Sequence, residues 1–127
     1  MEAHAPNYRD LRVWQEAMEL VPEVYGLIQR LPKIETFAMA DQMRRAAVSI
    51  PANIAEGQSR RHAREFLQHV SIVRGSLAEL ETLLLLAARL GYIASEEMSP
   101  VGERLIQLRF GLYALSAALG RKIRSAA

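Results

Sequence analysis

The sequence predicts an all-α protein, an antiparallel four-helix bundle in up-down-up-down order. Apolar residues recur at alternating three- and four-residue spacing in four separate segments, which is the signature of a helical seam. Prolines and glycines fall between these segments, and no stretch shows the alternation or the Asn-Gly and Asp-Gly turns of β-hairpins. Short connections favour antiparallel neighbours, so we expect one bundle domain over residues 1–127.

The first predicted helix covers about residues 9–30. Its seam consists of Leu11, Trp14, Met18, Val21, Tyr25 and Ile28. Pro22 lies in the middle of this segment, where it removes a backbone donor and clashes with the preceding turn. Because the seam stays aligned on both sides of Pro22, we expect a bend rather than a break. Pro32 ends the helix, since the residue before a proline avoids the helical region.

The second predicted helix covers about residues 35–56 and also contains a proline. Its seam consists of Ala40, Met43, Ala47, Ile50 and Ile54. Pro51 frees the carbonyl of Ala47, and we expect Asn53 or a water molecule to satisfy that carbonyl. Gly57 is well placed to close the helix as a left-handed residue.

The third and fourth helices are predicted at about residues 62–90 and 96–123. Their seams are Phe66, Val70, Val73, Leu77, Leu80, Leu84 and Ala87, and then Val101, Leu105, Leu108, Leu112, Leu115 and Leu119. Gly91 is expected to close the third helix. Ser95 is expected to cap the fourth, although the Ser99-Pro100 pair is a competing start.

Both of these helices carry apolar residues outside their seams. The run from Leu83 to Leu86 is apolar on nearly every face, and Ile106, Phe110, Tyr113 and Ala117 lie beside the fourth seam. Apolar surface of this kind on a small bundle favours contacts between subunits. The alternative is a thick core in a slightly irregular monomer.

Composition excludes several classes of protein. The longest uncharged apolar stretch, Leu83 to Ala88, is far shorter than the roughly 20 residues of a membrane span. The polar N-terminal residues lack the apolar region of a signal peptide, so we expect a cytoplasmic protein without a membrane partner. Cysteine is absent, which excludes disulfides and thiolate metal sites.

The sequence offers no catalytic constellation. The histidines are His4, His62 and His69, and the last two are seven residues apart, too far along a helix for one metal ion. No carboxylate pair resembles an acid–base dyad, and there is neither a G-x-S-x-G elbow nor a glycine-rich phosphate loop. We therefore expect no catalytic residues, no metal, no cofactor and no enzymatic activity.

Arginine dominates the basic residues, with 14 arginines among 16 lysines and arginines at a net charge of +2. A candidate patch for RNA or DNA lies at the end of the second helix, the loop and the start of the third: Arg44, Arg45, Arg60, Arg61 and Arg64. The alternative is that Arg44 or Arg45 pairs with Glu56, Glu79 or a neighbouring subunit, while the rest form a solvated rim. No aromatic residues are interleaved with these arginines, so base stacking receives no support.

Polar residues beside the seams form a second candidate site. They are Gln42, Asn53, Glu56, Ser76 and Glu79. Buried polar groups need partners and can fix helix register or oligomeric state. We expect these five residues to form one network that aligns the second and third helices, in which Glu56 holds an arginine.

Three blocks of sequence resemble a known family. They are YRDLRVWQEA from Tyr8, QMRRAAVSIPANIAEG from Gln42, and GSLAELE from Gly75 followed by a leucine run and LGYI. These blocks, in this order over about residues 8–121, resemble the four-helix-bundle proteins named for ribosomal-RNA intervening sequences. That family is similar to the accessory protein of diversity-generating retroelements.

The resemblance implies a left-handed bundle that assembles as a ring-shaped homopentamer. It also implies a basic surface that engages RNA or DNA and, in the retroelement branch, a reverse transcriptase partner. We therefore expect a non-enzymatic homo-oligomer with nucleic-acid binding through the arginine patch. The alternative function is a protein-binding scaffold whose arginines serve structural salt bridges.

Overall fold

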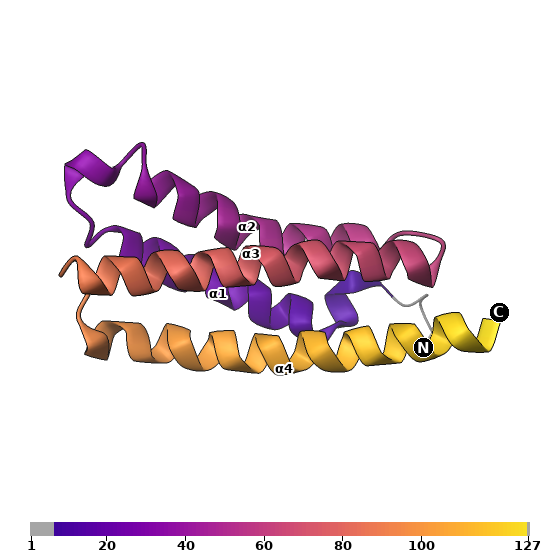
Figure 1. Cartoon of the computed structure of the whole chain (residues 1–127). Helices are drawn as coiled ribbons and strands as arrows, with labels where there is room; N and C mark the ends of the chain where they lie inside the picture. Colours follow the sequence, from indigo (N-terminus) through magenta and orange to yellow (C-terminus); the bar gives the residue numbers. More distant parts are fainter. Residues whose placement is uncertain (1–6, 127) are drawn as a thin grey trace, which may run out of the picture.

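The computed structural model describes residues 7–126. Its helices are α1 (Arg12–Ile28), α2 (Met39–Gln58), α3 (Ala63–Arg89) and α4 (Ser95–Ala126), with short 3₁₀ turns at Tyr8–Asp10 and Lys33–Glu35. The four helices lie alongside one another as a bundle, and residues 7–126 contain no strand (Figure 1). The all-α, four-helix prediction is confirmed, while the left-handed twist and the up-down-up-down order stay predictions.

One apolar core runs through the bundle. Helices α2, α3 and α4 bury the predicted seams, apart from the half-buried Phe66 and Leu115. Helix α1 instead buries a stripe displaced by one position: Val13, Ala17, Leu20, Val24 and Leu27. Met18 and Tyr25 of the predicted seam are consequently 47% and 41% exposed. Both stripes of α1 are apolar, so spacing alone could not identify the face that meets the core.

Helix α1 continues through Pro22 without a break, as expected. Pro22 lies on the exposed side of the helix, where water can take the place of the lost backbone donor. Pro51 of α2 is buried within a continuous helix. The side-chain amide of Asn53 donates to the carbonyl of Ser49 at 3.0 Å, not to that of Ala47 as expected.

Gly57 does not end α2. The helix continues to Gln58, and Gly57 is buried without a positive φ. A Cβ atom at Gly57 would lie 2.6 Å from Cβ of His69 and 2.9 Å from Cδ1 of Phe66, both on α3. The predicted left-handed cap is therefore wrong, and the glycine instead allows α2 and α3 to approach closely.

Gly91 does close α3, with φ +78°. The Tyr92 N–H donates to the Ala87 carbonyl at 2.9 Å, and the Gly91 N–H donates to the Ala88 carbonyl at 3.0 Å. These two bonds form a Schellman motif, which satisfies carbonyl groups at the helix end.

Helix α4 begins at the earlier of the two predicted starts. Its first residue is Ser95, so Pro100 lies inside the helix. The backbone N–H of Ala94 donates to the Glu97 carboxylate at 3.1 Å, which is half of a capping box. Ala94 thus takes the capping position expected for Ser95.

The connection between α1 and α2 is held against the α3–α4 turn. The Tyr92 hydroxyl donates to Glu35 at 3.0 Å, and Glu35 also accepts from the backbone N–H of Met39 at 3.4 Å. Because the neutral phenol donates this bond to a carboxylate, the pKa of Tyr92 lies above its ordinary value. The same connection leaves Ile34 and Phe37 83% and 94% exposed.

Candidate nucleic-acid interface

The five predicted arginines do not form one patch. Arg44 and Arg45 lie in the second turn of α2, not at its end as expected, because α2 begins only at Met39. Arg60 follows the other end of α2, roughly 24 Å from Arg44 along the helix at 1.5 Å per residue. The two halves of the predicted patch are therefore separated by most of the length of α2.

Arg44 and Arg45 are engaged within the first part of α2 and the connection before it. The guanidinium of Arg44 donates to the Thr36 carbonyl at 3.1 Å. Arg45 forms an ion pair with Asp41, one turn earlier, at 3.1 Å. Neither arginine pairs with Glu56 or Glu79, the acids considered as partners from the sequence. Both side chains therefore have local structural partners.

Arg61 and Arg64 lie together at the opposite end. With Lys122 of α4 they line a hollow of about 430 Å³. Arg60 lies beside them and pairs with Glu56 at 2.9 Å, as the sequence suggested for Glu56. Within residues 7–126, Arg61, Arg64 and Lys122 form no ion pair, and no carboxylate lines the hollow. We call these three residues the basic end.

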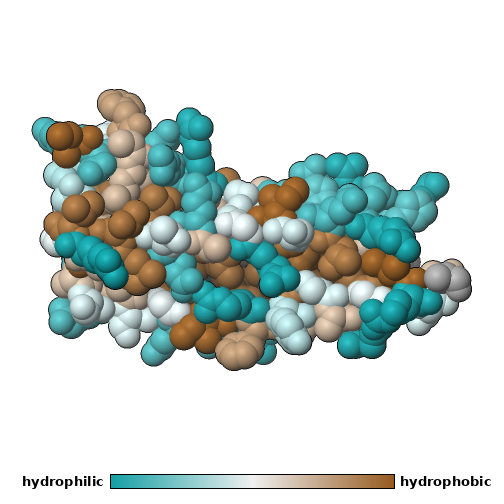
Figure 2. All heavy atoms as spheres, in the orientation of Figure 1, coloured by the Kyte–Doolittle hydropathy of each residue, from teal (hydrophilic) through white to brown (hydrophobic). Residues whose placement is uncertain are grey.

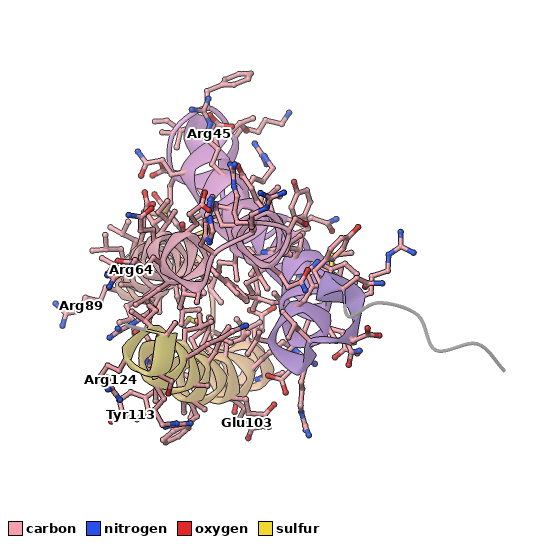
Figure 3. All side chains as sticks on the ribbon, turned by 90° about the vertical axis from the view of Figure 1, so that its right-hand side faces the viewer. Arg45, Arg64, Arg89, Glu103, Tyr113 and Arg124 are labelled. Atoms are coloured by element: carbon pink, nitrogen blue, oxygen red, sulfur yellow. The ribbon has the colours of Figure 1, made fainter. Side chains whose placement is uncertain are left out.

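Lys122 is a site residue that the sequence reasoning missed. In the end-on view, Arg64 and Arg124 project from the same flank of the bundle, formed by α3 and α4, whereas Arg45 projects over α2 (Figure 3). An antiparallel order of helices already implies that the end of α4 lies beside the start of α3. Combining that order with the basic run Arg121-Lys122 could have identified this neighbour.

A short polar chain links α2 and α3. The Ser49 and Ser76 hydroxyls are 2.8 Å apart, and the Asn53 amide donates to the Ser49 hydroxyl at 3.1 Å. The Asn53 carbonyl oxygen lies 3.2 Å from Nδ1 of His69. We call Ser49, Asn53, Ser76 and His69 the polar chain. All four residues are half-buried, and their bonds fix the register of the two helices.

The polar chain determines the tautomer of His69. The Ser49 backbone carbonyl can only accept a hydrogen bond, so the NH₂ of Asn53 must face it. The Asn53 oxygen then faces Nδ1 of His69, and Nδ1 must carry the proton. His69 is therefore a structural donor to α2.

The structure brings two of the five predicted network members together. Asn53 and Ser76 belong to the polar chain, whereas Glu56 pairs with Arg60. Gln42 and Glu79 are exposed and take no part in these bonds, because their side chains lie outside the α2–α3 contact. The sequence reasoning missed Ser49 and His69, which lie one turn from Asn53 and opposite it, respectively.

Residues 7–126 contain no cluster of three or more histidine, cysteine, aspartate or glutamate side chains that could hold a metal ion. His62 lines the hollow of the basic end and His69 belongs to the polar chain, while His4 lies outside the described residues. No helix within this range is long and apolar enough to cross a membrane.

Apolar side chains remain exposed along α4. Ile106, Phe110 and Tyr113 are 49%, 72% and 70% exposed, and their spacing places them on one face of the helix. Hydrophobic side chains also cluster at the left-hand end of the visible face in Figure 2. Leu85, Leu86 and Leu90 of α3 are 55%, 44% and 55% exposed. Large apolar residues are thus left outside the core of a single copy.

Residues 9–114 match the family described as 23S rRNA-intervening sequence protein. The chain belongs to this family. The resemblance drawn from the three sequence blocks is thereby confirmed. No curated protein is significantly similar to the chain.

A solved structure shares the fold of this chain. It is a protein with unknown function from the S23 ribosomal protein family of Bacteroides thetaiotaomicron VPI-5482. The two chains are 24% identical, with a TM-score of 0.75, over 82% of this chain and 97% of the other.

Proposed function

We propose that the protein is a non-enzymatic homo-oligomer that binds nucleic acid through its basic end. The observation that carries this proposal is the hollow lined by Arg61, Arg64 and Lys122, none of which has an acidic partner among residues 7–126. Unpaired guanidinium and ammonium groups on a concave surface attract phosphates and release condensed counterions on binding. The name of the family is consistent with a role connected to RNA.

Self-association is the second part of the proposal. Ile106, Phe110 and Tyr113 offer an apolar face on α4 that a second copy could cover. We expect a pentameric ring, as the family resemblance implies. Five copies would repeat the basic end around the ring, and multivalency raises a weak affinity without new contacts.

The competing function is a protein-binding scaffold, and the ion pairs of the bundle favour it. Arg104 of α4 pairs with Glu19 and Glu23 of α1, each at 2.7 Å. Its hydrogen bond to Glu23 raises the pKa of Arg104 above the ordinary value. Arginines that serve such pairs hold helices together and leave no charge for phosphates.

A salt-dependent binding assay separates the two functions. Wild-type protein is titrated into mixed-sequence RNA and DNA at low salt, and we expect an affinity that falls as salt rises. Joint Arg61→Gln and Arg64→Gln substitution should weaken binding about tenfold, on the scale of two exposed ion pairs. Arg45→Gln removes an exposed but paired arginine and serves as the control. No binding at low salt removes the nucleic-acid function and leaves the scaffold.

Analytical ultracentrifugation tests the oligomer separately. Wild-type protein should sediment as one species larger than a monomer, and joint Phe110→Ser and Tyr113→Ser substitution should shift it toward smaller species. Both residues are exposed in a single copy, so the substitutions should not unfold it. A wild-type monomer at high concentration contradicts the proposed self-association.

A further inference from the structure

A continuous furrow runs between α3 and α4. It consists of three adjoining hollows of about 430, 320 and 370 Å³. The first and second hollows share Arg64 and Ile123, and the second and third share Ser71. The furrow begins at Arg61, just before α3, and continues along α3 from Ala63 to Glu81, roughly 27 Å at 1.5 Å per residue. The basic end is therefore the beginning of a longer surface.

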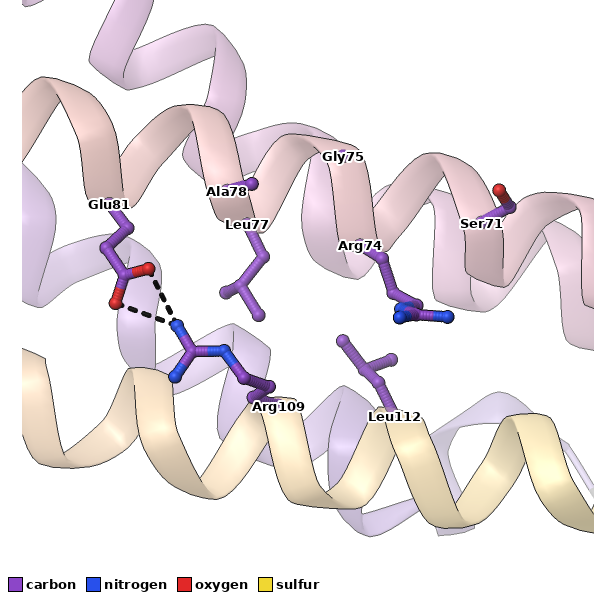
Figure 4. Close-up of a pocket in the computed structure, with 8 residues that line it drawn as sticks. All are labelled: Ser71, Arg74, Gly75, Leu77, Ala78, Glu81, Arg109 and Leu112. Atoms are coloured by element: carbon purple, nitrogen blue, oxygen red, sulfur yellow. Dashed lines mark hydrogen bonds and ion pairs between the residues drawn. The ribbon is translucent and has the colours of Figure 1, made fainter.

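Two further arginines line the far part of the furrow. Arg74 extends from α3 into the space between the helices, and Arg109 extends from α4 toward Glu81 (Figure 4). One nitrogen of Arg109 donates to both Glu81 oxygens at 2.7 Å, while Arg74 forms no ion pair among the described residues. Counting residues 7–126, five cationic side chains, those of the basic end with Arg74 and Arg109, line the furrow against one carboxylate, that of Glu81.

Gly75 keeps the far part of the furrow open. It lies in the interior of α3, where glycine weakens a helix relative to alanine. A Cβ atom at Gly75 would meet nothing within 4 Å, whereas a Cβ at Gly111 would lie 2.6 Å from Val13. Packing within the chain thus explains Gly111 but not Gly75. Close approach of an external backbone is a physical reason for such a glycine.

We propose that the furrow holds one strand of single-stranded nucleic acid, with phosphates on its cations and the strand passing close to Gly75. This inference rests on the proposed nucleic-acid function and names the form of its ligand. A concave track between two helices fits one backbone, whereas a duplex would leave its second strand outside. Among residues 7–126 no phenylalanine, tyrosine or tryptophan lines the furrow, and His62 is its one imidazole, so the strand is held chiefly by its phosphates. The length corresponds to about four to six nucleotides, at the short end of single-strand site sizes.

Fluorescence anisotropy with labelled oligothymidylates from about two to ten nucleotides tests the inference. Affinity should rise with length and level off near about five nucleotides for the wild type. Arg74→Gln should weaken binding about fivefold, at the upper end for one exposed ion pair, and should reduce the salt slope by about 0.7. Glu81→Gln should tighten binding about twofold, because it frees Arg109 from its partner.

Two control variants distinguish binding in the furrow from binding that depends only on the overall positive charge of the protein. Arg89→Gln removes an exposed arginine of the same helix outside the furrow and should change affinity less than about twofold. Gly75→Leu fills the furrow and should weaken binding, whereas Gly26→Leu at another unobstructed helical glycine should not.

The outcomes separate this inference from the proposed function. Equal loss in Arg74→Gln and Arg89→Gln, or duplex binding as tight as single-strand binding, overturns the furrow while nucleic-acid binding stands. Absence of wild-type binding to every oligonucleotide overturns both.

Discussion

The α2–α3 contact is closed, whereas the α3–α4 contact is open along its outer side. Between α2 and α3, Gly57 lets the backbone of α2 approach the side chains of His69 and Phe66, and the polar chain fixes the register. Between α3 and α4 a furrow remains that Gly75 lines, and its Arg61, Arg64, Arg74 and Lys122 form no ion pair with any residue in the range 7–126. Helix α3 therefore packs against α2 with one face and lines the furrow with another.

Gly57 and Gly75 differ in what surrounds them. Gly57 is explained by atoms less than 3 Å from its missing Cβ, while a Cβ at Gly75 would meet no atom of the described residues within 4 Å. Gly26 and Gly102 are equally unobstructed, but of these three glycines Gly75 is the one that lines the furrow between α3 and α4.

Gly57→Ala should destabilise the protein by about 2 kcal/mol. The added methyl group would meet the Cβ atom of His69 at 2.6 Å, and relief requires α2 and α3 to move apart. The gain in helix propensity offsets only part of this cost. Urea unfolding at fixed protein concentration measures the change, and an unchanged midpoint would show that the α2–α3 contact is looser than described.

Asn53→Ala should destabilise the protein by about 1 kcal/mol. It removes the side chain that joins Ser49 to His69 and leaves the Nδ1 proton of His69 without its partner. Gln42→Ala, on an exposed position of the same helix, is the matched control and should be neutral. Similar free energies of unfolding for both variants would rule out a structural role for the polar chain.

Gly75→Ala should stabilise the protein by about 0.5–1 kcal/mol. Nothing lies within 4 Å of the new methyl group, and alanine is the better residue in a helix interior. The expected change in the free energy of unfolding is opposite in sign to that for Gly57→Ala, although both variants replace glycine with alanine. Destabilisation by Gly75→Ala in the same urea assay would mean that the furrow is filled by the chain itself.

Ser116→Ala should change stability by less than about 0.5 kcal/mol, or increase it slightly. Its buried hydroxyl is without a hydrogen-bond partner in the described part of the chain, so alanine removes an unsatisfied group. Ser76→Ala removes a bonded hydroxyl of the polar chain and should cost more. A larger loss for Ser116→Ala would indicate a partner for that hydroxyl in solution.

The fold was predictable because apolar spacing is a local property of the sequence. The seams of α2, α3 and α4 and the Gly91 cap followed from the order of residues alone. The buried face of α1 did not, since its Met18–Tyr25 stripe is as apolar as the stripe that faces the core. Gly57 was misassigned because a glycine near a helix end resembles a cap unless the neighbouring helix is known.

The candidate site was less predictable because it depends on which helices are neighbours. Arg61 and Arg64 were identified, but their association with Lys122 requires the end of α4 beside the start of α3. Arg74 has no nearby basic residue in the sequence and joins the surface only through the furrow. Conversely, Arg44 and Arg45 were grouped with Arg60, Arg61 and Arg64 because they are near in sequence. Most of the length of α2 separates the two groups.

The most direct test asks whether the furrow between α3 and α4 binds nucleic acid. It compares the affinities of two doubly substituted variants for a short single strand. Arg64→Gln with Arg74→Gln removes two charges from the furrow, and Arg44→Gln with Arg45→Gln removes the same net charge from the other end. At low salt we expect the first variant to bind about tenfold or more weakly than the wild type and the second to bind within about twofold of it. Equal losses in the two variants would contradict the assignment of the furrow, because binding would then follow net charge alone.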